Sequence, residues 1–457
     1  MARMTIQRFS SPALLQELQR LPTPERYLIA FSGGLDSMVL LHALSRLTST
    51  LAPIRIEAVH VHHGLSALAD DWAIFCGEVC ETLNISLLQM RVDAGPPAGR
   101  SGEDWARSLR YRAISECMGP GDILLTAHHQ DDQAETLMLR LLRGAGARGL
   151  AAMTMLRPLP PGRLARPLLG FSRDQLQAYA EHHALRWVDD DSNRDCRFDR
   201  NFLRHEIMPV LNRRWPASAR SLGRAAGVQA DNAALLDELA AADVQAVAGS
   251  CKGRLSVSGL QGLSRRRCRN LLRYWIHQAG FSAPSLRQLQ QFEHDVLAAA
   301  ACSAAHLHWS EFDLRRYRDE VWILPVLPPH DPARIYPWEP PGSLVMAAGT
   351  LKACPASGQG LSRTACEAGR VNIRFRQGGE RLRLPGRAGQ RVLKKLLQEA
   401  GIPPWERDRL PLVYIDDALA AVADRWLSED FAAAPDEAGW SLHWRPLWVQ
   451  QQDRGDA

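Results

Sequence analysis

The sequence contains no long apolar run, no signal-like N-terminus and no closely paired cysteines. No segment approaches the roughly 18 uninterrupted apolar residues that a membrane-spanning helix needs. The first 20 residues mix Arg, Gln, Ser and Glu with Leu and lack the apolar core of a signal peptide. The nine cysteines are scattered and include no Cys-x-x-Cys pair, which argues against a disulfide scaffold and against a zinc ribbon. We therefore expect a cytoplasmic protein with reduced thiols and no membrane partner.

Lysine is the scarcest charged residue, with four copies against 51 arginines. Two of the four lysines are adjacent and lie in the most basic stretch of the chain, residues 371–395. This stretch holds eight basic residues and one acid, a net charge of +7, whereas the whole chain carries only +5. Such a stretch favours a partner with a phosphate backbone, and a solvated helix face is the alternative. A second basic run, residues 265–269, begins a predicted helix. We expect phosphate or RNA contacts from Arg265, Arg266, Arg381, Lys394 and Lys395.

The length of 457 residues is typical of about three domains. From residue 27 to about residue 188, short apolar runs alternate with amphipathic stretches. The strand-like runs are 27–31, 54–61, 85–92 and 123–127, and the helical stretches are 38–47, 70–83 and 103–118. This alternation predicts an α/β domain over residues 1–215, with a Rossmann-like parallel sheet that is covered by helices on both faces.

The remainder of the chain is predicted to form two smaller domains. Residues 216–324 indicate a mainly helical middle domain. Residues 325–341 hold seven prolines, which is typical of an extended linker, and we place the linker at 325–345. Residues 346–449 combine strand signals at 371–376 and 412–415 with a helix at 391–400, the pattern of a small α+β domain. Residues 450–457 form a polar tail that we expect to fray.

The most informative segment is the loop between the first apolar run and the first long helix. Its residues are Ser32, Gly33, Gly34, Leu35, Asp36 and Ser37. A helix N-terminus offers unpaired backbone N–H groups and the positive end of the peptide dipoles, and so it attracts anions. The glycines allow the backbone to approach a phosphate closely, the serines add hydroxyl donors, and Asp36 can hold a Mg²⁺ that bridges phosphates.

This loop does not match the common phosphate-binding patterns. It has no lysine and is shorter than the GxxxxGK[ST] loop, and it is not GxGxxG. Its position between a strand and a helix predicts a nucleotide-binding loop, and an ordinary strand-to-helix turn is the alternative.

A second polar segment, residues 128–136, follows the predicted strand at 123–127. Asp131 is expected to begin a helix, so Asp132 and Glu135, three residues apart, share one face. Two carboxylates near a nucleotide could bind a metal, act as a general base or hold a cationic substrate. The His-His-x-Asp-Asp spacing also fits a transition metal, but no other clustered ligands support that reading.

Two arginine pairs are candidates for anion contacts. Arg107 and Arg110 share one turn of a predicted helix, which suits a phosphate or carboxylate clamp. A salt-bridged surface helix is the alternative. Arg200 and Arg204 follow a polar loop that includes residues 190–193, and they would supply a second anion contact if they point into the same pocket.

The loop Ser32–Ser37 looks like the SGGxDS PP-loop of the ATP pyrophosphatases, which split ATP into AMP and pyrophosphate while they adenylate a substrate. Further motifs follow in a fixed order: Val61-His62-His63-Gly64-Leu65, Glu103-x-x-Ala106-Arg107-x-x-Arg110-Tyr111, residues 127–136, residues 143–150, Asp191-Ser192-Asn193 and Arg200-Asn201-x-x-Arg204. This series, which spans residues 27 to about 215, resembles the tRNA(Ile)-lysidine synthetase family. Residues 376–405 look like the additional tRNA-binding domain of its longer members.

The resemblance implies a reaction and its ligands. ATP, with Mg²⁺, would adenylate the C2 oxygen of the wobble cytidine of tRNA(Ile), and the ε-amine of free L-lysine would then displace AMP to give lysidine. Asp36, Asp132 and Glu135 would be catalytic, His62 would join the loop in binding ATP, and the two carboxylates of the 128–136 segment would hold lysine. Whether His62, His63 or a carboxylate takes the proton from lysine stays open.

Two other functions are compatible with parts of the sequence. A tRNA thiolase uses the same adenylation and then sulfur, and Cys76 and Cys80 lie one helical turn apart. A non-catalytic tRNA-binding protein with a decayed ATPase fold is the other alternative, which the intact loop disfavours. The sequence gives no indication of the oligomeric state.

Overall fold

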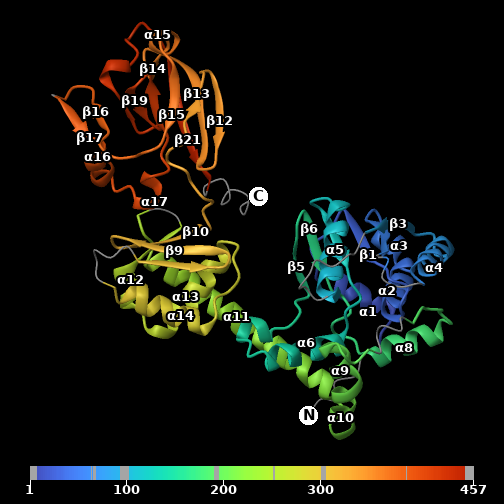
Figure 1. Ribbon diagram of the computed structural model, residues 1–457. Helices are drawn as coiled ribbons and strands as arrows, with labels where there is room; N and C mark the ends of the chain where they lie inside the picture. The colour runs from blue at the N-terminus through green and yellow to red at the C-terminus, as the bar shows by residue number, and fades with distance from the viewer. Residues whose placement is uncertain are drawn as a thin grey trace. The chain divides into compact units, whose positions relative to one another are not determined.

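The computed structural model describes residues 8–62, 64, 68–92, 102–189, 195–250, 253–299, 305–387 and 389–447 (Figure 1). The chain divides after Leu235 into two compact units. His63, the polar loop 190–194, the side chain of Glu103 and the tail 450–457 lie outside the described residues. No helix among these ranges is long and apolar enough to cross a membrane.

The first unit alternates strands and helices. Its elements are α1 (Ser11–Leu18), β1 (Arg26–Ala30), α2 (Leu35–Ser45), α3 (Thr48–Leu51), β2 (Arg55–His62), α4 (Ala69–Thr82), β3 (Ser86–Arg91), α5 (Gly102–Glu116), β4 (Asp122–Leu125), α6 (Gln130–Leu142), α7 (Ala147–Leu150), β5 (Leu156–Leu159), β6 (Gly162–Ala165), α8 (Arg173–His182), α9 (Asp199–Phe202), the π-helical turn η2 (Leu203–Ile207) and α10 (Met208–Arg214). The long helix α11 (Ser218–Ala246) crosses into the second unit. The predicted strands and helices of residues 27–127 are confirmed to within three residues at all of their ends.

These strands form one sheet in the order β3-β2-β1-β4-β6-β5. All neighbours are parallel except β5 and β6, which form an antiparallel hairpin at one edge. The predicted parallel α/β sheet is therefore correct. The strands that follow β1 are added first on one side of it, as β2 and β3, and then on the other side, as β4. This reversal of strand order beside β1 is the position where ligands bind in open α/β sheets.

Both faces of the sheet are buried, as the near-continuous apolar strands require. Tyr27 and Ile29 of β1 face a core built with α1, α2, α4 and α8. Leu28, which points to the other side, packs against Ile114 of α5 and Leu124 of β4. Figure 1 shows these helices around the sheet. The sheet is thus held rigidly, and its carboxyl edge can position loops.

The second unit begins with helices that pack on a small antiparallel sheet. Its elements are β7 (Arg254–Ser256), α12 (Val257–Gly262), α13 (Arg265–Gln278), α14 (Leu286–Phe292), the π-helical turn η3 (Glu293–Leu297), β8 (His306–Trp309), β9 (Phe312–Tyr317) and β10 (Glu320–Pro325). The sheet order is β7-β10-β9-β8, and its inner face joins α13 and α14 in one apolar core. The prediction of a mainly helical middle domain was therefore wrong in part, since it missed this sheet.

The rest of the second unit is mostly antiparallel β-structure. Its elements are β11 (Tyr336–Pro337), β12 (Gly342–Met346), β13 (Gly349–Ser357), β14 (Leu361–Ser362), α15 (Arg363–Ala368), β15 (Val371–Arg374), β16 (Arg381–Arg383), β17 (Gln390–Val392), α16 (Leu393–Glu399), α17 (Pro404–Arg407), β18 (Leu412–Ile415), β19 (Ala418–Val422), β20 (Trp426–Leu427), the 3₁₀ turn η4 (Glu429–Phe431) and β21 (Ala438–Pro446). Two sheets, β11-β15-β18-β19-β20 and β12-β13-β21-β14, enclose one core. The hairpin β16–β17 packs with α16 on a second core.

The proline-rich stretch 325–345 does not separate two independent bodies. It includes β11 and the start of β12, and the elements before and after it contact each other. The ring of Trp405 in α17 lies 5.6 Å from the ring of Trp322 in β10 and 6.2 Å from that of Tyr317 in β9. Arg407 donates a hydrogen bond to the Tyr317 hydroxyl, at 2.9 Å. The C-terminal sheets are therefore docked on the middle sheet through α17.

Candidate active site

The loop from Ser32 to Ser37 occupies the carboxyl edge of β1 and opens α2, as the sequence predicted. Gly33 has φ +83°, a conformation that glycine adopts without strain. The hydroxyls of Ser32 and Ser37 lie 3.1 Å apart, and the Ser37 hydroxyl donates to the carbonyl of Gly34 at 2.9 Å. Among the described residues, no side chain caps the N-terminus of α2. Its first backbone N–H groups are therefore placed to receive an anion.

Asp36, in the first turn of α2, has one engaged and one unengaged carboxylate oxygen. Its Oδ2 lies 3.5 Å from Nε2 of His129. Its Oδ1 is buried and has no hydrogen-bond partner among the described residues. A buried oxygen without a donor fits a cation, because burial without a partner is costly.

His129 links this loop to the acidic segment at the start of α6. Its Nε2 lies 3.4 Å from Oδ2 of Asp132 as well as beside Asp36, and its Nδ1 lies 3.6 Å from Oδ2 of Asp131. Burial lowers the pKa of His129, but Asp132, Asp131 and Asp36 outweigh it and raise the pKa to about 10. The sequence marked the His-His-x-Asp-Asp pattern without predicting this bridge.

Asp132 and Glu135 share one face of α6, as predicted, and both are almost fully buried, at 8% and 2% exposure. Each is paired with two arginines. The Nε and Nη2 of Arg200 donate to Glu135 Oε2 and Asp132 Oδ1, both at 2.8 Å. Arg204 donates to Glu135 Oε1 at 2.7 Å, to Glu135 Oε2 at 2.9 Å and to Asp132 Oδ1 at 3.0 Å.

The pKa shifts of Asp132, Arg200 and Arg204 favour the ionised forms of these three groups. Burial raises the pKa of Asp132, but the charges of His129 and the two arginines hold it well below its usual range. Burial lowers the pKa of Arg204, yet the hydrogen bond and charge of Glu135, with the charges of Asp132 and Asp36, raise it above its ordinary value. The two carboxylates and two guanidiniums together carry no net charge.

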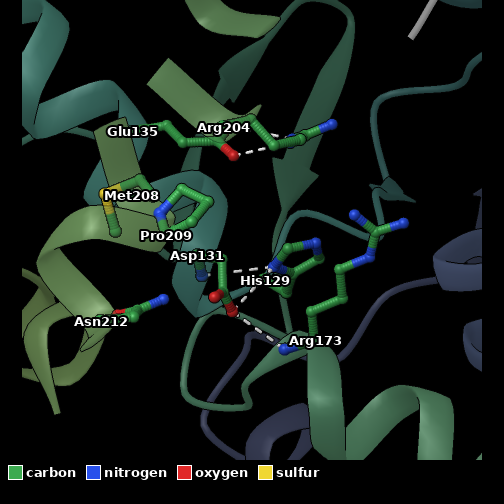
Figure 2. Close-up of a pocket in the computed structure, with 8 residues that line it drawn as sticks. All are labelled: His129, Asp131, Glu135, Arg173, Arg204, Met208, Pro209 and Asn212. Atoms are coloured by element: carbon green, nitrogen blue, oxygen red, sulfur yellow. Dashed lines mark hydrogen bonds and ion pairs between the residues drawn. The ribbon is translucent and has the colours of Figure 1, made fainter. Parts of the chain in front are cut away.

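A small hollow of about 140 Å³ opens beside this network (Figure 2). Its walls are His129, Asp131, Glu135, Arg173, Arg204, Met208, Pro209 and Asn212. Asp131 accepts a hydrogen bond from the backbone N–H of Arg173 at 2.9 Å and so ties α6 to α8. Acid, base and apolar side chains thus meet in one hollow. The sequence did not predict that the α10 residues Met208, Pro209 and Asn212 would line it.

The predicted site residues His62, Arg107 and Arg110 are not among those that line this hollow. His62 ends β2, and its buried Nδ1 has no hydrogen-bond partner among the described residues. Its Nε2 lies 3.1 Å from Oδ1 of Asp70, without hydrogen-bond geometry. Arg107 and Arg110 of α5 are exposed. Burial lowers the pKa of His128, and the positive charge of Arg107 lowers it further. Burial likewise lowers the pKa of His60, and the charge of Arg110 adds to this.

The basic residues of the second unit fall into paired and unpaired sets. Within the stretch 371–395, four arginines form ion pairs with acids: Arg374 with Asp417, Arg376 with Glu380 and Asp408, Arg383 with Glu429 and Asp430, and Arg391 with Glu399. Arg381, Lys394 and Lys395 are exposed and have no ion pair among the described residues, and the same holds for Arg265 and Arg266 at the start of α13. The three residues chosen from the basic stretch are thus available to a phosphate.

The structure also bears on two alternatives from the sequence, a transition-metal site at residues 128–132 and a tRNA thiolase that uses Cys76 and Cys80. In the described ranges, no group of three or more His, Cys, Asp or Glu side chains could hold a metal ion. Cys76 and Cys80 are buried in the core, and burial raises their pKa values to about 12 and about 11. Neither thiol is therefore disposed to act as a nucleophile at neutral pH.

Family models match three parts of the chain. A model of the PP-loop domain matches residues 7–211, a TilS substrate binding domain matches residues 255–322, and a TilS substrate C-terminal domain matches residues 371–444. Together they cover both units.

Whole-length comparisons find close relatives. The chain is 40% identical over 440 residues to the tRNA(Ile)-lysidine synthase of Coxiella burnetii (strain RSA 493 / Nine Mile phase I), covering 96% of this chain and 97% of that protein. It is 42% identical over 423 residues to that of Methylococcus capsulatus (strain ATCC 33009 / NCIMB 11132 / Bath), covering 92% and 96%. Among solved structures, the U34-tRNA thiolase NcsA from Methanococcus maripaludis is 18% identical with a TM-score of 0.42, over 48% of this chain and 77% of that chain.

Proposed function

Because the chain belongs to the tRNA(Ile)-lysidine synthase family, we propose that the carboxyl edge of its N-terminal sheet joins free lysine to the wobble cytidine of an isoleucine tRNA. The chain is an ATP-dependent ligase that modifies tRNA, as its identity of about 40% to such synthases over nearly the whole of both chains requires. In the proposed sequence, the cytidine C2 oxygen attacks the α-phosphorus of ATP and pyrophosphate leaves. The ε-amine of lysine then attacks C2, AMP leaves with that oxygen, and lysidine remains.

One observation carries the assignment of the site. The glycine–serine loop, the uncapped N-terminus of α2 and the acid pair of α6 lie at one edge of the sheet, and His129 contacts both Asp36 and Asp132. A nucleotide held by the loop would therefore have its reacting phosphate near the two carboxylates. Ser32 and Ser37 would donate to the pyrophosphate as negative charge develops on it.

Asp36 is the residue that would hold a Mg²⁺ ion. Its unpartnered buried Oδ1 fits a cation, and a single carboxylate with substrate phosphates and water is a common way to bind Mg²⁺. When bound, the ion would neutralise charge on the phosphates.

Asp132 and Glu135 are proposed to hold the lysine amine. Lysine must lose a proton before it attacks, and its free pKa near 10.4 leaves roughly one molecule in 2,500 neutral at pH 7. Two ionised carboxylates at the start of α6 would orient the ammonium group. His62, His63 and a carboxylate remain the alternatives for the group that takes the proton.

The RNA is proposed to be held by basic side chains of both units. Arg107, Arg110, Arg200 and Arg204 would contact phosphates near the nucleotide, and Arg265 and Arg266 would do so on the middle domain. Arg381, Lys394 and Lys395 would contact the tRNA away from its anticodon, because the nucleotide edge must already hold the anticodon loop. These three residues are exposed and have no ion-pair partner among the described residues.

The function is tested by incubating the protein with tRNA(Ile), ATP, Mg²⁺ and labelled lysine. We expect AMP release that depends on lysine, and label in the RNA. AMP release without lysine incorporation, or incorporation of sulfur, would favour the thiolase alternative, which the buried thiols of Cys76 and Cys80 disfavour. Binding of tRNA without AMP release would indicate a non-catalytic protein.

A further inference from the structure

The residues proposed to bind lysine and two of those proposed to bind phosphate neutralise each other in this structure. Asp132 and Glu135 carry two negative charges, and Arg200 and Arg204 carry two positive charges. We infer that the two arginines keep the acid pair closed to lysine until a phosphate group takes their guanidiniums. This inference rests on the proposed function, because it concerns regulation of that same site.

Every oxygen of the two carboxylates is already engaged. Arg200 and Arg204 together donate to Asp132 Oδ1 and to Glu135 Oε2, and Arg204 alone donates to Glu135 Oε1. The remaining oxygen, Asp132 Oδ2, accepts the backbone N–H of His129 at 3.0 Å. An arriving ammonium group would therefore find every carboxylate oxygen already hydrogen-bonded to a protein group, and no net negative charge on the four side chains.

The arginines also lie on the solvent side of the acids. The side chains of Arg200 and Arg204 are 22% and 23% exposed, whereas those of Asp132 and Glu135 are 11% and 3% exposed. A ligand that comes from solvent therefore meets guanidinium before carboxylate. Lysine is attracted only after the guanidiniums have moved or have been neutralised.

The segment that carries the arginines can change its conformation locally. Arg200 lies in the four-residue helix α9, and Arg204 lies in the π-helical turn η2 that follows. A π-helical turn holds one more residue than an α-helical turn, and such turns are frequent at functional sites. Conversion of this π-helical turn to an α-helical turn would rotate Arg204 about the helix axis without unfolding α10.

Phosphate is the ligand chemistry that suits the displaced guanidiniums. The planar fork of arginine binds phosphate in the same bidentate way as carboxylate. Arg204 lies within electrostatic reach of Asp36 in the nucleotide loop, which contributes to its raised pKa. The phosphate can come from the nucleotide or from the RNA backbone, and the experiment separates these sources.

The test measures binding of labelled lysine by equilibrium dialysis, without chemistry. The full-length protein is used alone, with an α,β-methylene ATP analogue that cannot release pyrophosphate, or with tRNA(Ile). Coupling free energies between sites typically correspond to factors of about 5 to 150. We expect lysine to bind at least about 10-fold more tightly with one of the two phosphate ligands than alone. The ligand that produces this gain is the one that displaces the arginines.

The second part of the test repeats the lysine-binding measurement on variants of the two arginines. In Arg200→Gln/Arg204→Gln, lysine should bind without any phosphate ligand at least as tightly as it binds the wild type with one, and the coupling should disappear. Arg197→Gln is the matched control, because Arg197 is exposed and pairs with Asp195; it should keep the wild-type coupling. If the double variant does not fold, the single variant Arg204→Gln and the charge-preserving Arg200→Lys/Arg204→Lys replace it, with reduced coupling expected in both.

Three results would overturn the inference: equal lysine affinity of the wild type with and without phosphate ligands, weaker lysine binding in the glutamine variants, or unchanged coupling in them. The proposed function is judged separately by lysine-dependent AMP release from wild-type protein. If that release occurs and the coupling does not, only the inference fails. If no such release occurs, the function itself is wrong.

Discussion

The basic residues of the hairpin β16–β17 and of α16 permit a quantitative test of RNA binding. Changing Arg381, Lys394 and Lys395 together to Ala removes three exposed positive charges that have no ion pair in the described part of the chain. If each contacts one phosphate, the slope of log affinity against log salt should fall by about 0.9 per residue, or about 2.7 in all. Raising salt from about 50 to 200 mM would then weaken the variant about 40-fold less than the wild type.

A matched control removes the same net charge from the same region. Arg374, Arg383 and Arg391 are each paired with an acid, so replacing all three with Ala should change the slope little, because paired guanidiniums release few counterions from RNA. Binding is measured by filter retention over a salt series. Equal slope changes in both triple variants would show that net charge, and not phosphate contact, sets the affinity.

The same variant tests where the contact lies. Lysidine formation on saturating full-length tRNA should fall little, and formation on an isolated anticodon stem-loop should not change. An equal loss on both substrates would place these residues at the anticodon and refute the proposed arrangement.

Three further predictions concern the first unit. Asp36→Ala should abolish pyrophosphate release and leave tRNA binding intact, as measured by a pyrophosphate assay and by filter retention; near-normal AMP formation would remove Asp36 from the metal site. Asp132→Asn and Glu135→Gln should each raise the lysine concentration required for half-maximal rate by roughly 10- to 150-fold, since each loses a charge-assisted hydrogen bond of about 1.5–3 kcal/mol; unchanged lysine dependence with slow ATP turnover would assign these carboxylates to the metal. Gly33→Ala places a Cβ 3.2 Å from Sγ of Cys76 at a positive φ, and should cost about 1–2 kcal/mol in unfolding free energy and impair ATP use; an unchanged melting temperature would contradict this strain.

The local parts of the fold and site could be predicted from the sequence. The apolar runs around β1, β2 and β4 and the glycine–serine loop depend on neighbouring residues, so their pattern is visible in the chain. The face shared by Asp132 and Glu135 follows from helical spacing alone. Each of these predictions needed no knowledge of distant residues.

Interactions between distant residues could not be predicted in this way. Glu135 and Arg200 are 65 positions apart, and no periodicity links them. The charge of the stretch 371–395 was counted correctly, but four of its six arginines are paired with acids. Most of these acids come from outside the stretch.

The missed middle sheet has a similar cause. Strand β9 carries Asp313 and Arg316 in buried positions, at 3% and 4% exposure. Arg316 is satisfied by the carbonyls of Val296 and Ala299, and Asp313 by His308 and neighbouring basic groups. These buried charges interrupt the apolar alternation that would otherwise indicate a strand.

The docking of Trp405 on β9 and β10 has a consequence for how the second unit would select the proposed RNA. Besides the ring contacts, Arg318 donates to the carbonyl of Gln398 at 2.9 Å, and Arg409 donates to that of Pro328 at 2.6 Å. The span between the basic start of α13 and the basic hairpin is then set by packing and not by the contour length of the prolines. If both surfaces bind RNA as proposed, a tRNA would have to present two phosphate groups at a separation that this packing sets. Under the proposed contacts, selection among tRNAs would depend on their dimensions as well as on their bases.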